Sequence, residues 1–353
     1  MSDKIKIVTE SGEQVEAQAP VIISASRSTD IPAFYAKWFI NRLKAGYCVW
    51  YNPFNQQPVY VSFANCKAVV FWTKNPRPLI PYLKELDERG IHYYFQFTMN
   101  NYENEGFEPN VPPIQKRIET FKELSQLIGK AKVIWRFDPL IVTPQLSPQE
   151  LLTRIWHIGN QIKGYTDKLV FSFIDINAYR KVQSNLVQET DFFSKETIEN
   201  SEFTKEQMNE IADGLAKYRD VWAKDSWQIS LGTCAEKIDL KQSCIEHNRC
   251  IDGELMKRIF ADDKDLVYYL NFGKMSEKNT LFDSETNLKL LSPEKQKDKG
   301  QRKACSCMIS KDIGMYNTCS HFCVYCYANS SRKSVKNNLP KFDQNAESLI
   351  FKY

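Results

Sequence analysis

Six short apolar runs that alternate with helix-like segments constrain the fold of this chain more than any other feature. The runs are rich in Val, Ile, Phe, Trp and Tyr, a composition typical of buried parallel strands. They span residues 21–27, 68–74, 92–98, 132–138, 168–174 and 227–233. The chain has 353 residues, 42% of them apolar, which suffices for one barrel with an extension. We therefore predict an α/β fold with a parallel sheet.

The segments between these runs carry helix signals. Several open with Pro, or with a Ser or Thr cap, and several end at Gly, which is the expected asymmetry of helix ends. Apolar residues also recur at helical spacing, as in Ile118, Phe121 and Leu124. The predicted helices span residues 32–46, 75–90, 112–129, 147–164 and 204–220.

The remaining parts of the chain define the predicted domain organisation. Residues 1–20 read as an N-terminal hairpin around Ser11 and Gly12, and residues 21–233 as the (β/α) barrel core. Residues 234–311 form a cysteine-containing insertion with a second metal site. Residues 312–353 hold a final strand (312–317), a cysteine loop and a C-terminal tail. If the final strand packs beside the first, the result is a TIM-like barrel, partial or closed, with a Cys-rich C-terminal extension.

The cysteine loop contains Cys319, Cys323 and Cys326 with the spacing C-x3-C-x2-C. A [4Fe–4S] cluster normally takes four thiolates, so three leave one iron open for another ligand. The alternatives are zinc, with His321 as the fourth ligand, and disulfides. His321 is awkward as a ligand because it lies between two of the cysteines. Disulfides are disfavoured because the chain opens without an apolar signal segment, so we expect a reducing, cytoplasmic location.

Charged and polar residues follow the predicted strands, where a buried strand should be apolar. In a parallel barrel such residues meet at one mouth and can bind a zwitterion. We expect Arg136 and Lys74 to bind the carboxylate of such a ligand, and Asp138 or Asp30 to bind its amino group. The alternative is an internal ion-pair network that only orients the strands. The candidates for catalysis are Lys74, Arg136 and Asp138, and those for cofactor binding are Arg27, Asp30 and Thr73.

A second set of cysteines precedes the final strand. Cys234, Cys250, Cys305 and Cys307 are candidate ligands of a second metal centre, either a second [4Fe–4S] cluster or structural zinc. Cys244 is the expected spare cysteine of this region, and His247 is a substitute ligand. Cys48 and Cys66, which also lie outside the cysteine loop, are expected to be ordinary core residues.

The sequence also resembles known families. It is similar to the bacterial family catalogued as domain of unknown function 1848, over most of residues 21–329. The segments that carry this resemblance are IISASRSTDIPAFY, VFWTKNP, YYFQFT, VIWRFDPL, CAEKIDL, CIDGEL and DIGMYNTCSHFCVYCYAN. The tail, TKNP and RFDPL also resemble spore photoproduct lyase-like radical S-adenosylmethionine enzymes. This second resemblance implies that Cys319, Cys323 and Cys326 ligate a cluster and that Tyr325 lies near the adenine of the cofactor. It also implies a barrel circularly permuted relative to the usual radical S-adenosylmethionine barrel, because the cysteine loop follows the last strand rather than the first.

The leading hypothesis is therefore a radical S-adenosylmethionine enzyme. It would need a flavodoxin- or ferredoxin-type reductant, and its substrate is unknown, with nucleic acid among the candidates. The alternatives are a zinc- or iron–sulfur-stabilised module that binds nucleic acid or protein without catalysis, and an electron-transfer protein. The formal net charge of +4 does not by itself indicate nucleic-acid binding. No apolar run approaches the length of a membrane span, so no membrane association is expected.

Overall fold

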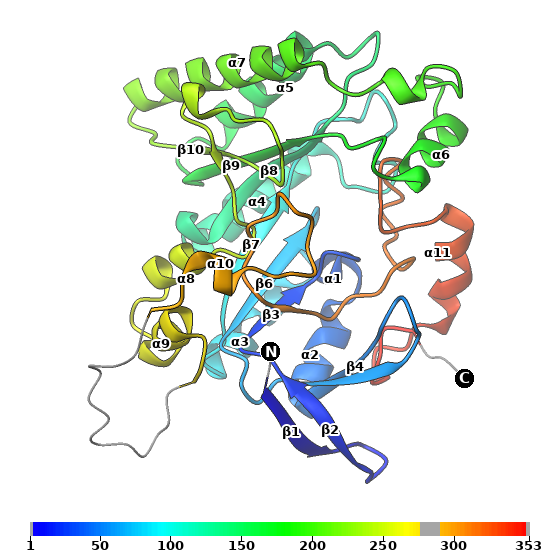
Figure 1. Cartoon of the computed structure of the whole chain (residues 1–353), viewed down its shortest axis with the longest axis vertical. Helices are drawn as coiled ribbons and strands as arrows, with labels where there is room; N and C mark the ends of the chain where they lie inside the picture. The colour runs from blue at the N-terminus through cyan, green and yellow to red at the C-terminus, as the bar shows by residue number, and fades with distance from the viewer. Residues whose placement is uncertain (1–2, 276–289, 351–353) are drawn as a thin grey trace.

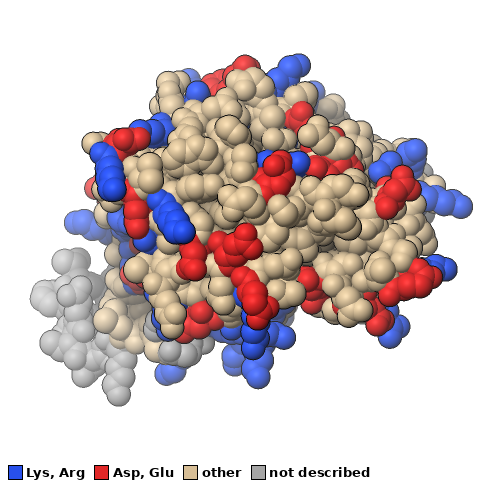
Figure 2. Space-filling model, turned by 90° about the horizontal axis from the view of Figure 1, so that it is seen from above, with Lys and Arg blue, Asp and Glu red and all other residues tan. Residues whose placement is uncertain are grey.

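The computed structural model describes residues 3–275 and 290–350. Residues 276–289 of the predicted insertion and the last three residues of the predicted tail lie outside this range. The described helices include none with the length and apolar character needed to cross a bilayer. On the face that Figure 2 shows, acidic and basic side chains are interspersed rather than gathered into one basic surface.

An eight-stranded sheet forms the centre of the molecule, and all of its neighbouring strands are parallel. Its order is β11-β10-β9-β8-β7-β6-β3-β12. The six predicted runs correspond to β3 (Ile22–Ala25), β6 (Ala68–Thr73), β7 (His92–Thr98), β8 (Val133–Leu140), β9 (Lys168–Phe173) and β10 (Ser230–Thr233). The edge strands β11 (Glu246–His247) and β12 (Lys311–Asp312) have two residues each. The predicted α/β fold with a parallel sheet is confirmed. Within the described residues no pairing joins β11 to β12, so a closed barrel is not seen.

The helices follow the predicted segments, with local adjustments. The first is divided at Tyr35 into α1 (Ile31–Phe34) and α2 (Ala36–Ala45), and the second contains η1 (Ile80–Tyr82) and α3 (Leu83–Glu88). The other three are α4 (Ile114–Ile128), α5 (Pro148–Gln161) and α7 (Lys205–Lys224). Thr204 begins α7 with a capping box that includes Gln207. The structure also contains η2 (Lys130–Lys132), α6 (Arg180–Glu189), η3 (Ile198–Asn200), η4 (Lys241–Ser243), α10 (Pro293–Gln296), α11 (Arg332–Asn338) and η6 (Leu339–Lys341).

The two faces of the sheet bury different partners because successive strand residues point in opposite directions. Val69, Phe95 and Trp135 belong to the main core, together with residues from α2, α3, α4, α5 and α7. The residues next to them in sequence, including Val70 and Tyr94, pack against α8 (Gly253–Ile259), α9 (Lys264–Phe272) and residues near Cys307. The predicted insertion therefore covers the second face of the sheet (Figure 1).

A second, four-stranded sheet of order β1-β2-β5-β4 lies at the opposite end of the molecule from α5 and α7 (Figure 1). The hairpin expected around Ser11 and Gly12 is present, with β1 (Asp3–Val8) antiparallel to β2 (Gln14–Ala19). The sequence analysis did not predict β4 (Tyr47–Tyr51) and β5 (Pro58–Ser62), which pair antiparallel. The turn between them brings Asn52, Pro53 and Phe54 to the cavity described below.

The final strand is shorter than predicted. Residues 312–317 were expected to form it, but β12 is Lys311–Asp312, and it pairs in parallel with Ile23 and Ser24 of β3. The Asp312 carboxylate makes the stronger connection. It accepts hydrogen bonds from the hydroxyls of Ser24 (2.8 Å), Ser26 (2.8 Å) and Ser28 (3.4 Å), and from the backbone N–H groups of Arg27 (2.8 Å) and Gly314 (2.9 Å). Asp312 thereby joins the start of the C-terminal segment to the loop after β3.

We predict that Asp312→Asn lowers the free energy of unfolding by about 2 kcal/mol, because an amide nitrogen cannot accept the hydrogen bonds that a carboxylate oxygen accepts. Chemical denaturation measures the loss. Asp343→Asn is the matched control, because Asp343 is exposed and accepts only a local bond from Asn345. Equal stability of the two variants would contradict the role given to Asp312.

A second prediction concerns the contact between α5 and α7. A Cβ added at Gly159 would lie 2.4 Å from Cζ2 of Trp222, a buried ring stacked on Trp156. We expect Gly159→Ala to destabilise the protein by about 2 kcal/mol, because a rigid indole cannot move aside. In Gly214→Ala the new Cβ meets the flexible end of Leu152, so we expect a change under about 1 kcal/mol. Thermal or chemical unfolding of both variants tests this order, and a Gly159→Ala protein as stable as the wild type would contradict it.

Candidate active site

A cavity of about 690 Å³ lies at the carboxyl ends of the central strands. Its wall includes residues that follow β3, β6, β9 and β10, residues in the second half of β8, and the cysteine loop. In parallel α/β folds this edge is where active sites form. All the candidate site residues from the sequence line this one cavity: Arg27, Asp30, Thr73, Lys74, Arg136, Asp138, Cys234, Cys250, Cys305, Cys307, Cys319, Cys323, Tyr325 and Cys326.

The cysteine loop is held in place by hydrogen bonds from its surroundings. The hydroxyl of Tyr35 donates to the Thr318 carbonyl (2.6 Å), and the Asn329 side chain donates to the Cys319 carbonyl (2.8 Å). Within the loop, the Cys326 N–H donates to the Cys323 carbonyl (3.1 Å). The loop therefore presents its three cysteines to the cavity from a fixed backbone.

The thiols of the cysteine loop are in a desolvated environment. Burial raises the pKa of all three thiols, and neighbouring charges, including the other thiols, raise it further for Cys319. Thiols of this kind are neutral at pH 7 unless a positive metal centre takes the place of the proton. As they stand, they are not reactive thiolates in the manner of a cysteine nucleophile.

Both ring nitrogens of His321 contact oxygen atoms of the protein. Its Nε2 lies 2.8 Å from Asp30 Oδ2, and its Nδ1 lies 3.3 Å from the Asn110 carbonyl oxygen. Both ring nitrogens face acceptors, so neither has a lone pair directed at the cavity. This arrangement does not favour the zinc alternative in which His321 completes the set of Cys319, Cys323 and Cys326.

Asp30 connects three elements of the site. One of its oxygens accepts from the Ala33 N–H (2.9 Å) and caps α1, and the other accepts from the Lys74 N–H (2.7 Å) and faces His321. The carboxylate therefore already has three partners, which fits a positioning residue better than a binder of an amino group. Thr73, beside it on β6, is buried and accepts a hydrogen bond from the Asn75 N–H (2.9 Å).

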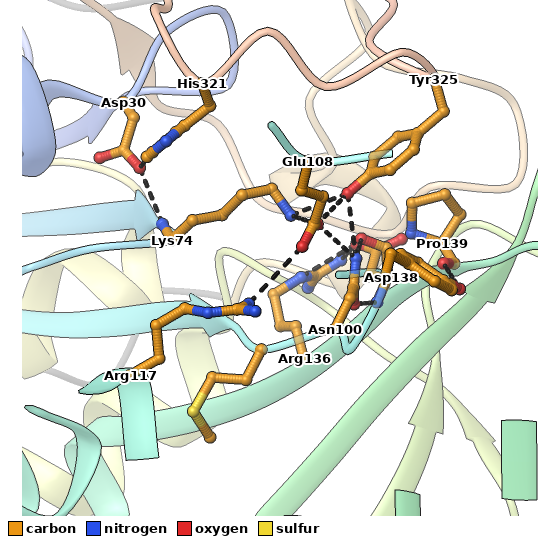
Figure 3. A network of polar contacts seen from close by, with 12 residues as sticks. Asp30, Lys74, Asn100, Glu108, Arg117, Arg136, Asp138, Pro139, His321 and Tyr325 are labelled. Atoms are coloured by element: carbon orange, nitrogen blue, oxygen red, sulfur yellow. Dashed lines mark hydrogen bonds and ion pairs between the residues drawn. The ribbon is translucent and has the colours of Figure 1, made fainter. Parts of the chain in front are cut away.

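Lys74 and Tyr325 meet at a buried carboxylate that the sequence analysis did not identify, that of Glu108 (Figure 3). Lys74 Nζ donates to Glu108 Oε1 (2.7 Å) and to the Tyr325 hydroxyl (3.0 Å). The Tyr325 hydroxyl also donates to Glu108 Oε1, and Asn100 Nδ2 lies 3.1 Å from the same oxygen. Arg117 approaches the other oxygen at 3.6 Å.

The charges in this network stabilise one another. Burial alone would raise the pKa of Glu108, but Lys74 and Arg117 lower it to about 2, so the carboxylate is ionised at neutral pH. Burial alone would lower the pKa of Lys74. The neighbouring Glu108 carboxylate has the larger effect, so the pKa of Lys74 is raised above its ordinary value. Lys74 is therefore a charged ammonium whose partner is Glu108, and it could bind a carboxylate ligand only by sharing that partner.

Arg136 and Asp138 form a second buried pair, which Asn100 connects to the Glu108 network: the Asp138 N–H donates to Asn100 Oδ1 (2.8 Å) (Figure 3). The guanidinium binds Asp138 Oδ2 through Nε (3.0 Å) and Nη2, and its Nη1 donates to Gln96 Oε1 (3.0 Å). Ser172 donates to the other oxygen of Asp138. Burial raises the pKa of Asp138, but Arg136 and these hydrogen bonds lower it below its ordinary value. Arg136 and Asp138, two of the charged residues predicted at the strand ends, are therefore paired with each other.

Arg27 differs from these cations. Its guanidinium lies over the Trp72 ring (5.2 Å to the centroid), and its nearest carboxylate oxygen, Asp298 Oδ2, is 3.9 Å away. Among the described residues its Nη2 has no hydrogen-bond partner. A buried, unsatisfied donor in a cavity wall is suited to an anionic group of a ligand.

The second cysteine set is also brought together. Cys234 Sγ lies 3.4 Å from Cys250 Sγ, and the Cys250 N–H donates to Cys307 Sγ (3.2 Å). Cys305 lines the cavity beside Cys307, whereas Cys244 is exposed and lines a separate small pocket with His247. As the side chains are placed, no three or more His, Cys, Asp or Glu residues in ranges 3–275 and 290–350 surround a point that could hold a metal ion.

Glu236, in the quoted segment CAEKIDL, lies next to the cavity-lining residues Cys234 and Ala235, and sequence reasoning did not single it out. Its Oε1 accepts from the Phe173 N–H at the end of β9 (2.9 Å). Burial and nearby Asp175 raise its pKa to about 8. A glutamate two residues after a cysteine at a strand end is a signal that could have identified it.

These features define a class: an α/β protein with a parallel sheet and a cysteine-lined, charge-paired cavity at the carboxyl ends of its strands. The chain belongs to the family described as Domain of unknown function (DUF1848), whose model matches residues 22–328. Among solved structures, it is similar to a "putative alpha-L-fucosidase" from Bacteroides thetaiotaomicron VPI-5482. That similarity has a TM-score of 0.27 at 12% identity and covers 56% of this chain and 84% of the other. No curated protein matches the chain.

The buried network predicts the effect of neutralising Glu108. Glu108→Gln leaves Lys74 and Arg117 without their anion, so we expect a loss of about 3 kcal/mol in the free energy of unfolding. Glu123→Gln is the matched control, because Glu123 pairs with Arg77 at the surface (2.8 Å), where a pair contributes under about 1 kcal/mol. Urea denaturation of both variants provides the comparison. A Glu108→Gln protein no less stable than the control would show that the two cations have other partners.

Proposed function

We propose that the protein is a radical S-adenosylmethionine enzyme in which Cys319, Cys323 and Cys326 bind a [4Fe–4S] cluster and leave one iron open. The observation that carries the proposal is the position of these cysteines. Three soft sulfur ligands from one short loop line a cavity at the carboxyl ends of parallel strands. Iron–sulfur clusters take cysteine thiolates, and three of them leave one coordination site for a small molecule.

The surroundings of the loop fit such a group. The nearest histidine, His321, is occupied by Asp30 and a backbone carbonyl, so it does not supply a fourth ligand. The cavity also offers Arg27, whose partly unsatisfied guanidinium suits the carboxylate of S-adenosylmethionine. Tyr325 presents an aromatic ring held through its hydroxyl by Glu108 and Lys74, in keeping with the adenine-proximal position that the family resemblance implies.

When bound, the cluster and S-adenosylmethionine would supply radical chemistry, in which one electron from a flavodoxin- or ferredoxin-type reductant would allow cleavage of a carbon–sulfur bond and hydrogen-atom abstraction from the substrate. The residues of this chain would bind, orient and shield the reactants. Lys74, Arg136 and Asp138 are proposed to keep the cavity polar and rigid, and Asp30 to hold the cysteine loop against the loop after β3. The cysteine loop follows the last strand, so we propose a circularly permuted relative of the radical S-adenosylmethionine barrel.

The proposal is tested by anaerobic reconstitution with iron and sulfide, followed by reductant and S-adenosylmethionine. We expect 5′-deoxyadenosine to form, because the open iron binds the cofactor, and we expect its formation to be lost in Cys323→Ala. Cys244→Ala is the matched control, since Cys244 is an exposed cysteine outside the cavity and should leave product formation unchanged.

Two results would contradict the proposal. One is a wild-type yield of 5′-deoxyadenosine no higher than that of Cys323→Ala. The other is a colourless, zinc-loaded protein from an anaerobic preparation, which would favour the non-catalytic module that binds nucleic acid or protein.

A further inference from the structure

We propose that Cys234, Cys250, Cys305 and Cys307 form a second metal centre whose protein ligands are four thiolates. This centre lies in the same cavity as the cysteine loop but uses none of its residues. It deepens the proposed function by adding a closed metal site to the cavity that holds the open one. Its test is metal content, so it can succeed or fail independently of radical chemistry.

The fold brings these cysteines together from three separate segments. Cys234 directly follows β10, and Cys250 follows β11, the neighbour of β10 in the sheet. The pair Cys305 and Cys307 comes from the segment before β12. A backbone hydrogen bond from the Met308 N–H to the Ile251 carbonyl (3.1 Å) holds that segment against Cys250. The thiols of Cys234 and Cys250 are in direct contact, 3.4 Å apart.

Hydrogen-bond donors are directed at the sulfur atoms. Cys307 Sγ accepts from the N–H groups of Cys250 (3.2 Å) and Ile251 (3.4 Å). Cys250 Sγ accepts from Arg136 Nη1 (3.0 Å) and lies 3.6 Å from Asn248 Nδ2. Donors of this kind stabilise sulfur in its anionic form, and they are the second-shell contacts that metal thiolates and iron–sulfur clusters use.

Four thiolates in this position would need a cation between the sulfurs. The positive charge of Arg136 is already paired with the Asp138 carboxylate. Neighbouring thiolates in contact would repel one another without a further positive charge, and a thiophilic metal ion or cluster provides it. In the structure the thiols are linked pairwise rather than gathered around one point, so the proposal rests on their proximity and on the donors that face them.

The simpler explanation is that these cysteines are small apolar core residues. Two other cysteines of this chain are examples of such core residues. Cys48 and Cys66 are buried, and the Cys66 thiol acts as a donor, 3.7 Å from the Ala68 carbonyl. Cys250 and Cys307 are also buried in a hydrophobic cluster, but their sulfurs accept hydrogen bonds from N–H groups and line the cavity, which an apolar core role alone does not explain.

Both zinc and an iron–sulfur cluster bind four thiolates. The experiment therefore uses the full-length Cys319→Ala/Cys323→Ala/Cys326→Ala variant, in which the cysteine loop cannot hold a cluster. It is purified anaerobically and analysed for zinc, iron and acid-labile sulfide. We expect roughly one zinc, or roughly four irons with matching sulfide, per chain, and the metal present identifies the centre.

Adding Cys250→Ala to this variant should remove the metal, whereas adding Cys244→Ser, at the exposed cysteine of the same segment, should retain it. X-ray absorption at the edge of the retained metal provides a second measurement that needs no further substitution. It should show sulfur ligands alone. Three results would overturn the proposal. They are a triple variant of the cysteine loop that contains no metal, a disulfide between Cys234 and Cys250 instead of a metal site, and nitrogen or oxygen ligands at the retained metal.

Discussion

The hydrogen bonds to the Asp312 carboxylate are the contacts on which the arrangement of the site depends. The strand that carries Asp312 has only two residues, and its backbone pairing alone would hold the C-terminal segment weakly against β3. The Asp312 carboxylate also accepts hydrogen bonds from the hydroxyls of three serines and from two backbone N–H groups. Gly314 lies so close to this cluster that a Cβ there would meet Ser26 Oγ at 1.8 Å. The cysteine loop follows this connection in the sequence, a few residues after β12.

A second connection fixes the far side of the loop. The contact between His321 and Asp30 joins the loop to the N-terminus of α1, and the Tyr325 hydroxyl joins it to Glu108 and Lys74. Residues from both ends of the chain and from its middle thus meet around one cavity. Buried charges are tolerated there because each has an opposite charge or hydrogen-bond donors within reach. The same pairing holds the side chains of the wall in defined positions, which the proposed radical chemistry would require.

Much of this architecture could be predicted from the sequence because the central strands are buried on both faces. Such strands read as continuous apolar runs, and the charges that follow them mark the edge where ligands bind. The strands β4 and β5 were missed because they are short and are separated by the polar turn around Asn52. The final strand was predicted too long because the segment after Asp312 is held by side-chain hydrogen bonds rather than by strand pairing. Glu108 could not be identified because a buried carboxylate in a loop resembles a solvated one until its partner, Lys74, is known to be adjacent.

The central claim is that the cysteine loop holds a cluster with one iron open to S-adenosylmethionine. Electron paramagnetic resonance of the reduced, reconstituted protein, recorded with and without S-adenosylmethionine, tests this most directly. The account predicts a signal from a reduced [4Fe–4S] cluster with a component whose g values shift when the cofactor is added, and this component should be absent from Cys326→Ala. A spectrum in which no component shifts on addition of S-adenosylmethionine, or a shifting component that survives the loss of Cys326, would contradict the account.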